Sequence, residues 1–106
     1  METCTWPLGN GESLSFTIYT QATAWNKVAG LYIFAYSDEP KHWVSLYVGQ
    51  TEDFSSRIPN HERWASALQR GATHVHTLVV PQEANRLLWE RMMIQHLRPV
   101  LNEQLR

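Results

Sequence analysis

The fold is decided by two stretches, residues 30–36 (Gly-Leu-Tyr-Ile-Phe-Ala-Tyr) and residues 43–49 (Trp-Val-Ser-Leu-Tyr-Val-Gly). Both are short, apolar and aromatic, which is typical of β-strands. The polar residues 37–42 between them indicate a turn, so the two stretches are predicted to pair as an antiparallel hairpin. The two-residue period of a strand predicts two faces for the first stretch: Tyr32, Phe34 and Tyr36 on one face, and Leu31, Ile33 and Ala35 on the other.

The segments next to this hairpin predict one helix and one additional strand. Residues 54–70 are predicted to form a helix that ends at Gly71, with a kink or a late start at Pro59. Residues 14–19 alternate apolar and polar side chains, which makes them a candidate for an additional edge strand near the N-terminus.

The C-terminal third predicts a further strand and a further helix. Residues 73–80 have the composition of a strand. A helix is predicted from Pro81 to about Leu97, where Arg98-Pro99 stops it. The order strand, strand, helix, strand, helix predicts a small α+β domain with helices packed on an antiparallel sheet.

Composition predicts one folded domain. The chain has 106 residues, of which 43% are apolar and 11% aromatic, enough for a modest core. Cys4 is the only cysteine, which favours a reducing, cytoplasmic setting. No apolar run approaches the roughly 18 residues of a membrane span, so no membrane partner is expected. The N-terminal residues lack the pattern of a secretory signal.

Charge is unevenly divided along the chain. The net charge of −1 argues against strong binding of nucleic acid, because such proteins usually carry a basic surface. Residues 57–106, however, contain seven arginines and four acids, whereas residues 1–56 contain two lysines and six acids. The second half therefore remains compatible with a modest, salt-sensitive affinity for nucleic acid.

Glu90 is the strongest candidate for a functional residue. On a helical projection it lies on the same stripe as Leu87, Ile94 and Leu97, which predicts that the carboxylate faces the packed side of the helix. A carboxylate in that position needs a partner or a cation. One interpretation is an ion pair with Arg57 or Arg86, and the other is a metal ligand.

Arg57, His61, Tyr32 and Tyr47 are weaker candidates when each is taken alone. An arginine can bind a phosphate through two parallel hydrogen bonds, and a histidine can exchange a proton near neutral pH. Arg57 and His61 share one side if their helix is regular, but they are equally compatible with an ordinary surface. The tyrosines are compatible with core packing. As a general base, a tyrosine needs its pKa lowered by roughly 3 units, which a nearby arginine and a divalent cation could supply.

Taken together, these residues resemble the GIY-YIG nuclease superfamily. Gly30-Leu31-Tyr32 is similar to the first motif of that family, and Tyr47-Val48-Gly49 to the second. The remaining matches follow in the family's order: Arg57, His61, Glu90 and Asn102. The 14 residues between Tyr32 and Tyr47 are slightly more than is usual in the family, which predicts an enlarged hairpin turn.

The resemblance implies a fold and a domain organisation. It implies a three-stranded antiparallel sheet flanked by helices, in the order β-β-α-β-α. Residues 26–106 would form the nuclease domain, and residues 1–25 an extension packed on or beside it. Family members commonly carry a separate DNA-binding domain, and no segment of this chain matches one. Specificity would then come from residues 1–29, the hairpin, a homodimer or a partner protein, or would be absent.

The resemblance also implies an activity, the cleavage of nucleic acid, with DNA favoured over RNA, by a water molecule and a divalent cation, Mg²⁺ or Mn²⁺. Glu90 would hold the cation, Tyr32 would help to deprotonate the water and Tyr47 would support it. Arg57 would bind the scissile phosphate and His61 would assist. Gly49 and Asn102 would support the site. The alternative hypothesis is a non-catalytic module on the same fold that binds nucleic acid or protein.

Overall fold

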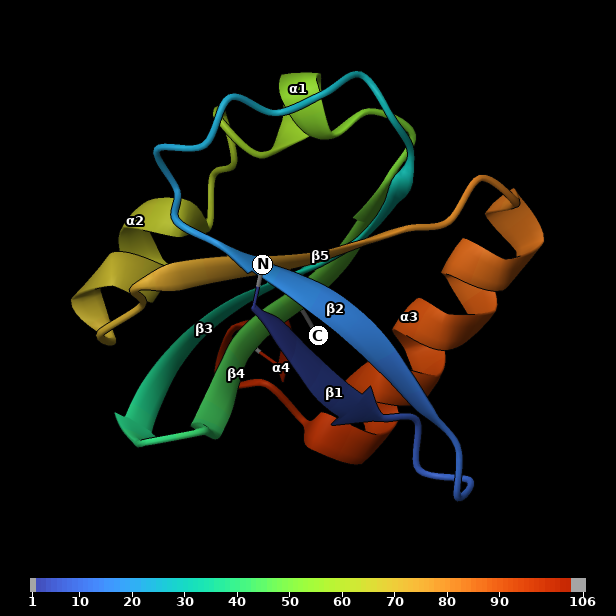
Figure 1. The fold of residues 1–106 in the computed structure, drawn as a ribbon, viewed down its shortest axis with the longest axis horizontal. Helices are drawn as coiled ribbons and strands as arrows, with labels where there is room; N and C mark the ends of the chain where they lie inside the picture. The colour runs from blue at the N-terminus through green and yellow to red at the C-terminus, as the bar shows by residue number, and fades with distance from the viewer. Residues whose placement is uncertain (1, 104–106) are drawn as a thin grey trace.

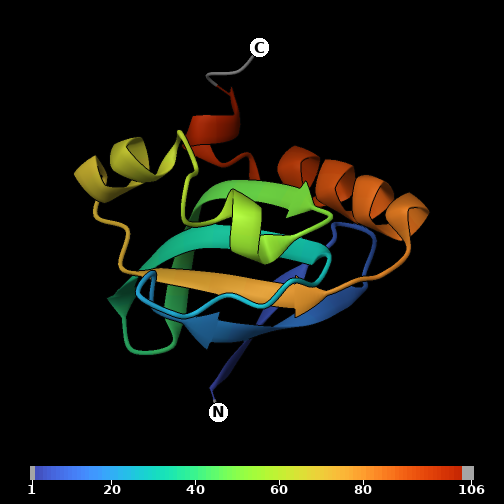
Figure 2. The ribbon, with the colours of Figure 1, turned by 90° about the horizontal axis from the view of Figure 1, so that it is seen from above.

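A computed structural model describes residues 2–103 as one curled antiparallel sheet with helices packed against it (Figures 1 and 2). The strands are β1 (Thr3–Pro7), β2 (Ser13–Tyr19), β3 (Gly30–Glu39), β4 (His42–Thr51) and β5 (His74–Val79). The helices are α1 (Phe54–Arg57), α2 (Trp64–Gln69), α3 (Glu83–Leu97) and α4 (Val100–Glu103). No helix within this range is long and apolar enough to cross a lipid bilayer.

The sheet has five strands in the order β1-β2-β5-β3-β4, so the expected three-stranded sheet is wrong in number. The three predicted strands are β3, β4 and β5, and they are adjacent. The candidate edge strand at residues 14–19 exists as β2, but it lies inside the sheet because β1 pairs along its other side. Thr3–Pro7 has no clear alternating pattern, and only the pairing with β2 makes it a strand.

The β3–β4 hairpin is longer than the sequence predicts. The loop contains only Pro40 and Lys41, and Lys41 adopts a left-handed conformation with φ of 65°. The 14 residues between Tyr32 and Tyr47 therefore lengthen the strands and do not enlarge the turn. The register places Tyr32 opposite Gly49 and Tyr47 opposite Phe34, which sets the motif residues side by side.

The two predicted faces of β3 are confirmed, and each belongs to a separate core. Tyr32 and Phe34 pack in one core with residues of α1, α2 and α4. Leu31, Ile33 and Ala35 pack in the other core, against α3 and the β1–β2 hairpin. The sheet is thus buried on both faces, and the motif tyrosines belong to the face that α1, α2 and α4 cover.

The predicted helix over residues 54–70 is broken into two short helices. Asp53 caps α1, where its side chain accepts a hydrogen bond from the Ser55 backbone N–H at 2.9 Å. The chain leaves the helix after Arg57, and Pro59 lies in the connecting turn, since proline cannot donate the next helical hydrogen bond. Gly71, with φ of 96°, ends α2 in the predicted place, in a Schellman-type cap.

The predicted stripe of helix α3 is confirmed at Ile94 and Leu97, which pack against the core, but not at Leu87. Arg86 and Met93 are buried, whereas Leu87 is 48% exposed, so the expected place of Leu87 on the packed side is wrong. The reason is the buried guanidinium of Arg86, which donates hydrogen bonds to the carbonyl oxygens of Val80 and Pro81 and to Gln50. Glu90 is consequently half-buried at the border of the packed side.

Candidate active site

Tyr32 is the centre of the candidate site. Its side chain is 1% exposed, and its hydroxyl oxygen lies 2.8 Å from Nε2 of His61. Across the sheet the ring lies directly over Gly49. A Cβ added to Gly49 would stand 2.5 Å from both Cζ and the hydroxyl oxygen of Tyr32. Glycine at this position therefore makes the room that the tyrosine ring occupies.

Replacing Gly49 with alanine is expected to destabilise the protein by about 2 kcal/mol, because an overpacked core must shift buried groups. Urea unfolding followed by circular dichroism measures this. In a Tyr32→Leu background, where the ring is absent, the same glycine change is expected to cost less than half as much. An equal cost in both backgrounds would show that the ring does not determine the residue at position 49.

His61 is a neutral hydrogen-bond donor at physiological pH. Burial, and secondarily the nearby charge of Arg57, lowers the pKa of His61 to about 4. Its Nδ1 accepts the backbone N–H of Arg63 at 3.0 Å, so the ring carries its proton on Nε2. The Nε2–H group therefore donates to the oxygen of Tyr32. The expected proton exchange near neutral pH does not suit a histidine with this pKa.

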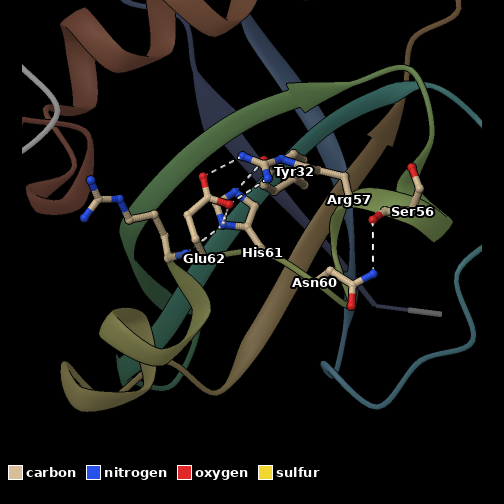
Figure 3. Close-up of polar contacts among 7 residues, drawn as sticks. Tyr32, Ser56, Arg57, Asn60, His61 and Glu62 are labelled. Carbon is tan, nitrogen blue, oxygen red and sulfur yellow. Dashed lines mark hydrogen bonds and ion pairs between the residues drawn. The ribbon is translucent and has the colours of Figure 1, made fainter.

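Arg57 also interacts with the Tyr32 phenol. A side-chain hydrogen bond from its guanidinium is one of the influences that lower the pKa of Tyr32. The guanidinium also donates from Nη1 and Nη2 to the two carboxylate oxygens of Glu62, at 2.7 and 3.0 Å (Figure 3). The Tyr32 oxygen thus accepts from two donors, His61 and Arg57.

Arg57 and His61 come together without sharing a helix. The regular helix that a shared side would require does not form, because α1 ends at Arg57 and a turn that contains Pro59 separates it from α2. Within this turn the His61 N–H donates to the Ile58 carbonyl at 3.3 Å, and the Trp64 N–H donates to the His61 carbonyl at 3.1 Å. The turn directs the imidazole inward, with its side chain fully buried.

Tyr47 completes the aromatic part of the cluster. Its ring lies 4.9 Å from the His61 ring and 6.2 Å from the Tyr32 ring, measured between centroids. It stacks on Phe34 at 5.7 Å, and it is 8% exposed. Both tyrosines are thus core aromatics, with their hydroxyl groups beside the polar cluster.

The pKa values of both tyrosines are raised, contrary to the lowering that a general base requires. Burial is the largest cause for each, and the charges of Glu90 add to it. Arg57 acts in the opposite direction on both. The protein groups alone therefore keep Tyr32 and Tyr47 protonated at neutral pH.

Glu90 stands near the tyrosines but forms no ion pair with Arg57 or Arg86. Burial raises the pKa of its carboxyl group, and a hydrogen bond from the Gln50 backbone partly offsets the effect. Arg57 binds Glu62, and Arg86 binds backbone carbonyls and Gln50. Because its charge raises the pKa of both tyrosines, the Glu90 carboxylate shares their electrostatic environment.

Asn102 fastens the outer edge of β4 next to the second motif. Its side-chain oxygen accepts the Val48 N–H at 2.8 Å, and its amide donates to the Val48 carbonyl at 2.9 Å. These two bonds replace a neighbouring strand at that point of β4. The residue thus holds Val48, which lies between Tyr47 and Gly49.

Comparison with solved structures places this geometry among known folds. The chain is similar to the GIY-YIG N-terminal endonuclease domain of UvrC from Thermotoga maritima, in a point mutant bound to its catalytic divalent cation. The identity is 25%, the TM-score is 0.57, and the match covers 71% of this chain and 82% of that domain. The same domain with magnesium bound matches at 23% identity and a TM-score of 0.56, over 71% and 83% of the chains. No protein-family model and no curated protein sequence matches the chain.

The fold and the ordered motif residues decide the assignment. The chain belongs to the GIY-YIG superfamily. In this GIY-YIG chain the two motif triplets lie on adjacent strands of the sheet, with Tyr32 over Gly49. Arg57 and His61 approach the first tyrosine from the turn between α1 and α2.

Glu62 is the residue of this GIY-YIG site that the sequence analysis did not identify. It directly follows His61, and its carboxylate takes both outer donors of Arg57. That pairing lowers the pKa of Glu62 to about 2, so the side chain stays ionised at any physiological pH. An acid adjacent to a motif histidine and five positions from the motif arginine is the only signal that the sequence offered.

The donor set of this GIY-YIG chain fits a hard cation held through few protein groups. Within residues 2–103, no group of three or more His, Cys, Asp or Glu side chains is arranged to hold a metal ion. Glu90 presents a half-buried carboxylate near the tyrosines, and it forms no ion pair with Arg57 or Arg86. Mg²⁺ commonly uses one or two carboxylates and keeps several waters, so a single acid is sufficient when substrate oxygens are added.

Acid is expected to destabilise this GIY-YIG domain between about pH 6.5 and pH 4. The pKa values of His61 and His76 are each lowered to about 4, chiefly by burial. The folded state favours the neutral rings, so stability is full above the unfolded pKa of about 6.5 and falls as the pH drops towards 4.

The loss from pH 7 to pH 5 is expected to be about 1–2 kcal/mol per histidine. Urea unfolding at the two pH values measures it. In His61→Gln the difference between the two pH values should be about half that of the unmodified chain. An unchanged difference would contradict the buried, neutral state of His61.

Proposed function

We propose that this protein is a divalent-metal-dependent endonuclease that hydrolyses phosphodiester bonds of nucleic acid, with DNA favoured over RNA. The observation that carries the proposal is the convergence on one phenol oxygen. His61 and Arg57 donate to Tyr32, and the charge of Glu90 acts on the same group. These residues are spread over almost sixty positions of the sequence, and a core tyrosine needs no such set of partners.

Tyr32 is proposed to accept a proton from the attacking water. A phenolate at this position would keep both hydrogen bonds, since its oxygen accepts from His61 and Arg57 in either state. Burial opposes this ionisation, so an additional positive charge is needed. When bound at Glu90, Mg²⁺ or Mn²⁺ would supply that charge and would offset charge on the leaving oxygen.

The other residues are proposed to position the substrate and the phenol and to neutralise charge on the phosphate. Arg57 is proposed to bind the scissile phosphate, because its planar guanidinium fits two phosphate oxygens at once. Tyr47 is proposed to support Tyr32. Gly49 leaves the space for the phenol, and Asn102 holds β4 in place beneath it.

Residues 26–106 are proposed to be the nuclease domain. Residues 1–25 contribute β1 and β2, which extend its sheet beyond β5. A homodimer or a partner protein is proposed as a source of specificity, and a cytoplasmic location remains a prediction. A partner surface built on exposed tryptophan is not favoured, because the five tryptophans, all within residues 2–103, are buried or half-buried.

One set of observations favours the alternative, a non-catalytic module that binds nucleic acid or protein. Arg57 is neutralised by Glu62, and the tyrosine pKa values are raised. Both facts describe the protein without a cation or substrate, and the nuclease proposal requires that both change on binding.

The test is incubation of the purified protein with single- and double-stranded DNA and RNA, with and without Mg²⁺ or Mn²⁺. The expected result is cation-dependent cleavage that leaves a 5′-phosphate and a 3′-hydroxyl. Binding without cleavage under every condition would support the non-catalytic alternative.

A further inference from the structure

The most unusual charged contact in the described chain is the pair between Arg57 and Glu62. Both outer nitrogens of the guanidinium are engaged by one carboxylate, at 2.7 and 3.0 Å. Two parallel hydrogen bonds to two oxygens of one anion are also the arrangement by which arginine binds phosphate. The Glu62 carboxylate therefore occupies the face of Arg57 that a substrate phosphate would need.

This pair is accessible from solvent. The Arg57 side chain is 36% exposed and the Glu62 side chain 64% exposed. Exposed ion pairs of this kind contribute little to folding stability. Glu62 lies in the turn between α1 and α2, outside both helices. Its side chain can therefore leave Arg57 without unfolding either helix.

The rest of the environment holds Arg57 in place when Glu62 is absent. The guanidinium also donates to Tyr32, whose phenol is itself fixed by His61. Asp53 caps the helix that carries Arg57. Glu62 is thus not required to orient the arginine.

We infer that Glu62 is an internal competitor of the substrate phosphate for Arg57, and that it sets the affinity of the site for nucleic acid. The inference rests on the proposed function in taking phosphate as the ligand of Arg57. A bound phosphate must displace the Glu62 carboxylate, so the free energy of breaking the Arg57–Glu62 pair reduces the net affinity for phosphate. The Arg57–Glu62 pair therefore lowers the affinity for nucleic acid that makes no other contact with the site.

The test compares Glu62→Gln with the unmodified protein in binding a short fluorescent duplex, without divalent cations and at low salt. Glutamine keeps the length of the side chain and removes its charge. Binding is expected to become roughly 3–10-fold tighter, since the lost competitor was an exposed ion pair. In the unmodified protein the displaced Glu62 carboxylate is expected to stay close to the bound duplex, where its negative charge lowers the net number of counterions released. The salt dependence of binding should therefore become steeper by about one unit in the variant.

Glu39→Gln is the matched control, because it makes the same change in net charge at an exposed position on the β3–β4 hairpin. It is expected to leave both the affinity and the salt dependence almost unchanged. An equal gain in Glu39→Gln would overturn the inference in favour of a general charge effect. Unchanged or weaker binding by Glu62→Gln would overturn it as well, since Glu62 would then position Arg57.

A titration with inorganic phosphate separates this inference from the proposed function. The ¹⁵N resonance of the Arg57 side chain is followed in both proteins. Even if neither protein binds nucleic acid, phosphate should shift this resonance at a several-fold lower concentration in Glu62→Gln. Equal concentrations in the two proteins would overturn the inference, whatever the outcome of the cleavage experiments.

Discussion

Glu90→Gln is expected to lower the rate of cleavage by about 10³-fold, and to leave the fold and the binding of nucleic acid intact. Glutamine keeps the shape of the side chain but loses the charge that a divalent cation requires. Removal of one fixed electrostatic partner of a reaction typically costs about 10²–10³-fold. Here the loss also removes the carboxylate whose charge acts on both tyrosines, so we expect the upper end.

The change is not expected to destabilise the protein. Burial already raises the pKa of Glu90, which means that the ionised form is the unfavourable one in the cation-free fold. The neutral glutamine should therefore make the protein equally stable or slightly more stable, as measured by urea unfolding. Cleavage is measured under single-turnover conditions with saturating Mg²⁺.

Glu83→Gln is the control for the loss of a carboxylate from the same helix. Glu83 is exposed in the first turn of α3, seven positions before Glu90. We expect its activity to remain within a factor of about two of the unmodified protein. Cleavage by Glu90→Gln at the rate of this control would remove Glu90 from the proposed mechanism.

The core of the fold could be predicted because its signals are local. The alternation in residues 30–36 set both faces of β3, and Gly71 marked the end of α2. The N-terminal strands were harder. Thr3–Pro7 is a strand only because β2 lies beside it, and pairing of this kind leaves little trace in a five-residue segment.

In helix α3 the buried Arg86 explains why the helical projection misplaced Leu87. A helical projection treats arginine as a solvent residue, and it therefore placed Leu87 on the packed side. Arg86 is buried because the carbonyl oxygens of Val80 and Pro81, just after β5, accept its donors. That compensation comes from tertiary structure, so the sequence pattern could not contain it.

The candidate site could also be predicted only in part. The motif residues were assembled as a set by the family resemblance, and the structure brings Tyr32, Arg57 and His61 together, whereas their catalytic roles stay predictions. The protonation states could not be predicted. The raised pKa of Tyr32 and the lowered pKa of His61 both come from the depth of burial. Glu62 was missed because an acid in a polar turn has no distinguishing spacing.

The raised pKa of Tyr32 gives the proposed site a condition for activity. His61 and Arg57 donate to the phenol oxygen. Burial, then the neighbouring Tyr47 and, to a smaller extent, the charge of Glu90 nevertheless raise its pKa. A cation at Glu90 would offset the negative charge of Glu90 and add a positive charge near the phenol. Ionisation of Tyr32 would thereby be coupled to cation binding, and the metal-free protein would hold its general base in the inactive, protonated form.

Tyr32→Phe tests that role, and it is expected to lower cleavage by about 10²–10³-fold, within the range typical of general acid–base catalysis. Phenylalanine keeps the ring over Gly49 and removes only the oxygen, which leaves His61 Nε2–H without its acceptor. The fold should survive with a cost of about 1–2 kcal/mol for that buried donor. Single-turnover cleavage across pH 6–9 measures the effect, and the rise in rate with pH should disappear in the variant.

Tyr36→Phe makes the same chemical change two positions beyond Phe34, on the same strand and the same face, at a half-buried site. It should cleave at nearly the unmodified rate and keep the pH dependence. If Tyr32→Phe retained that pH dependence, the titrating base would have to be another group. The hydrogen bonds from His61 and Arg57 would then serve to fix the phenol as part of the core, because a structural role requires the ring and the contacts but not the ionisation.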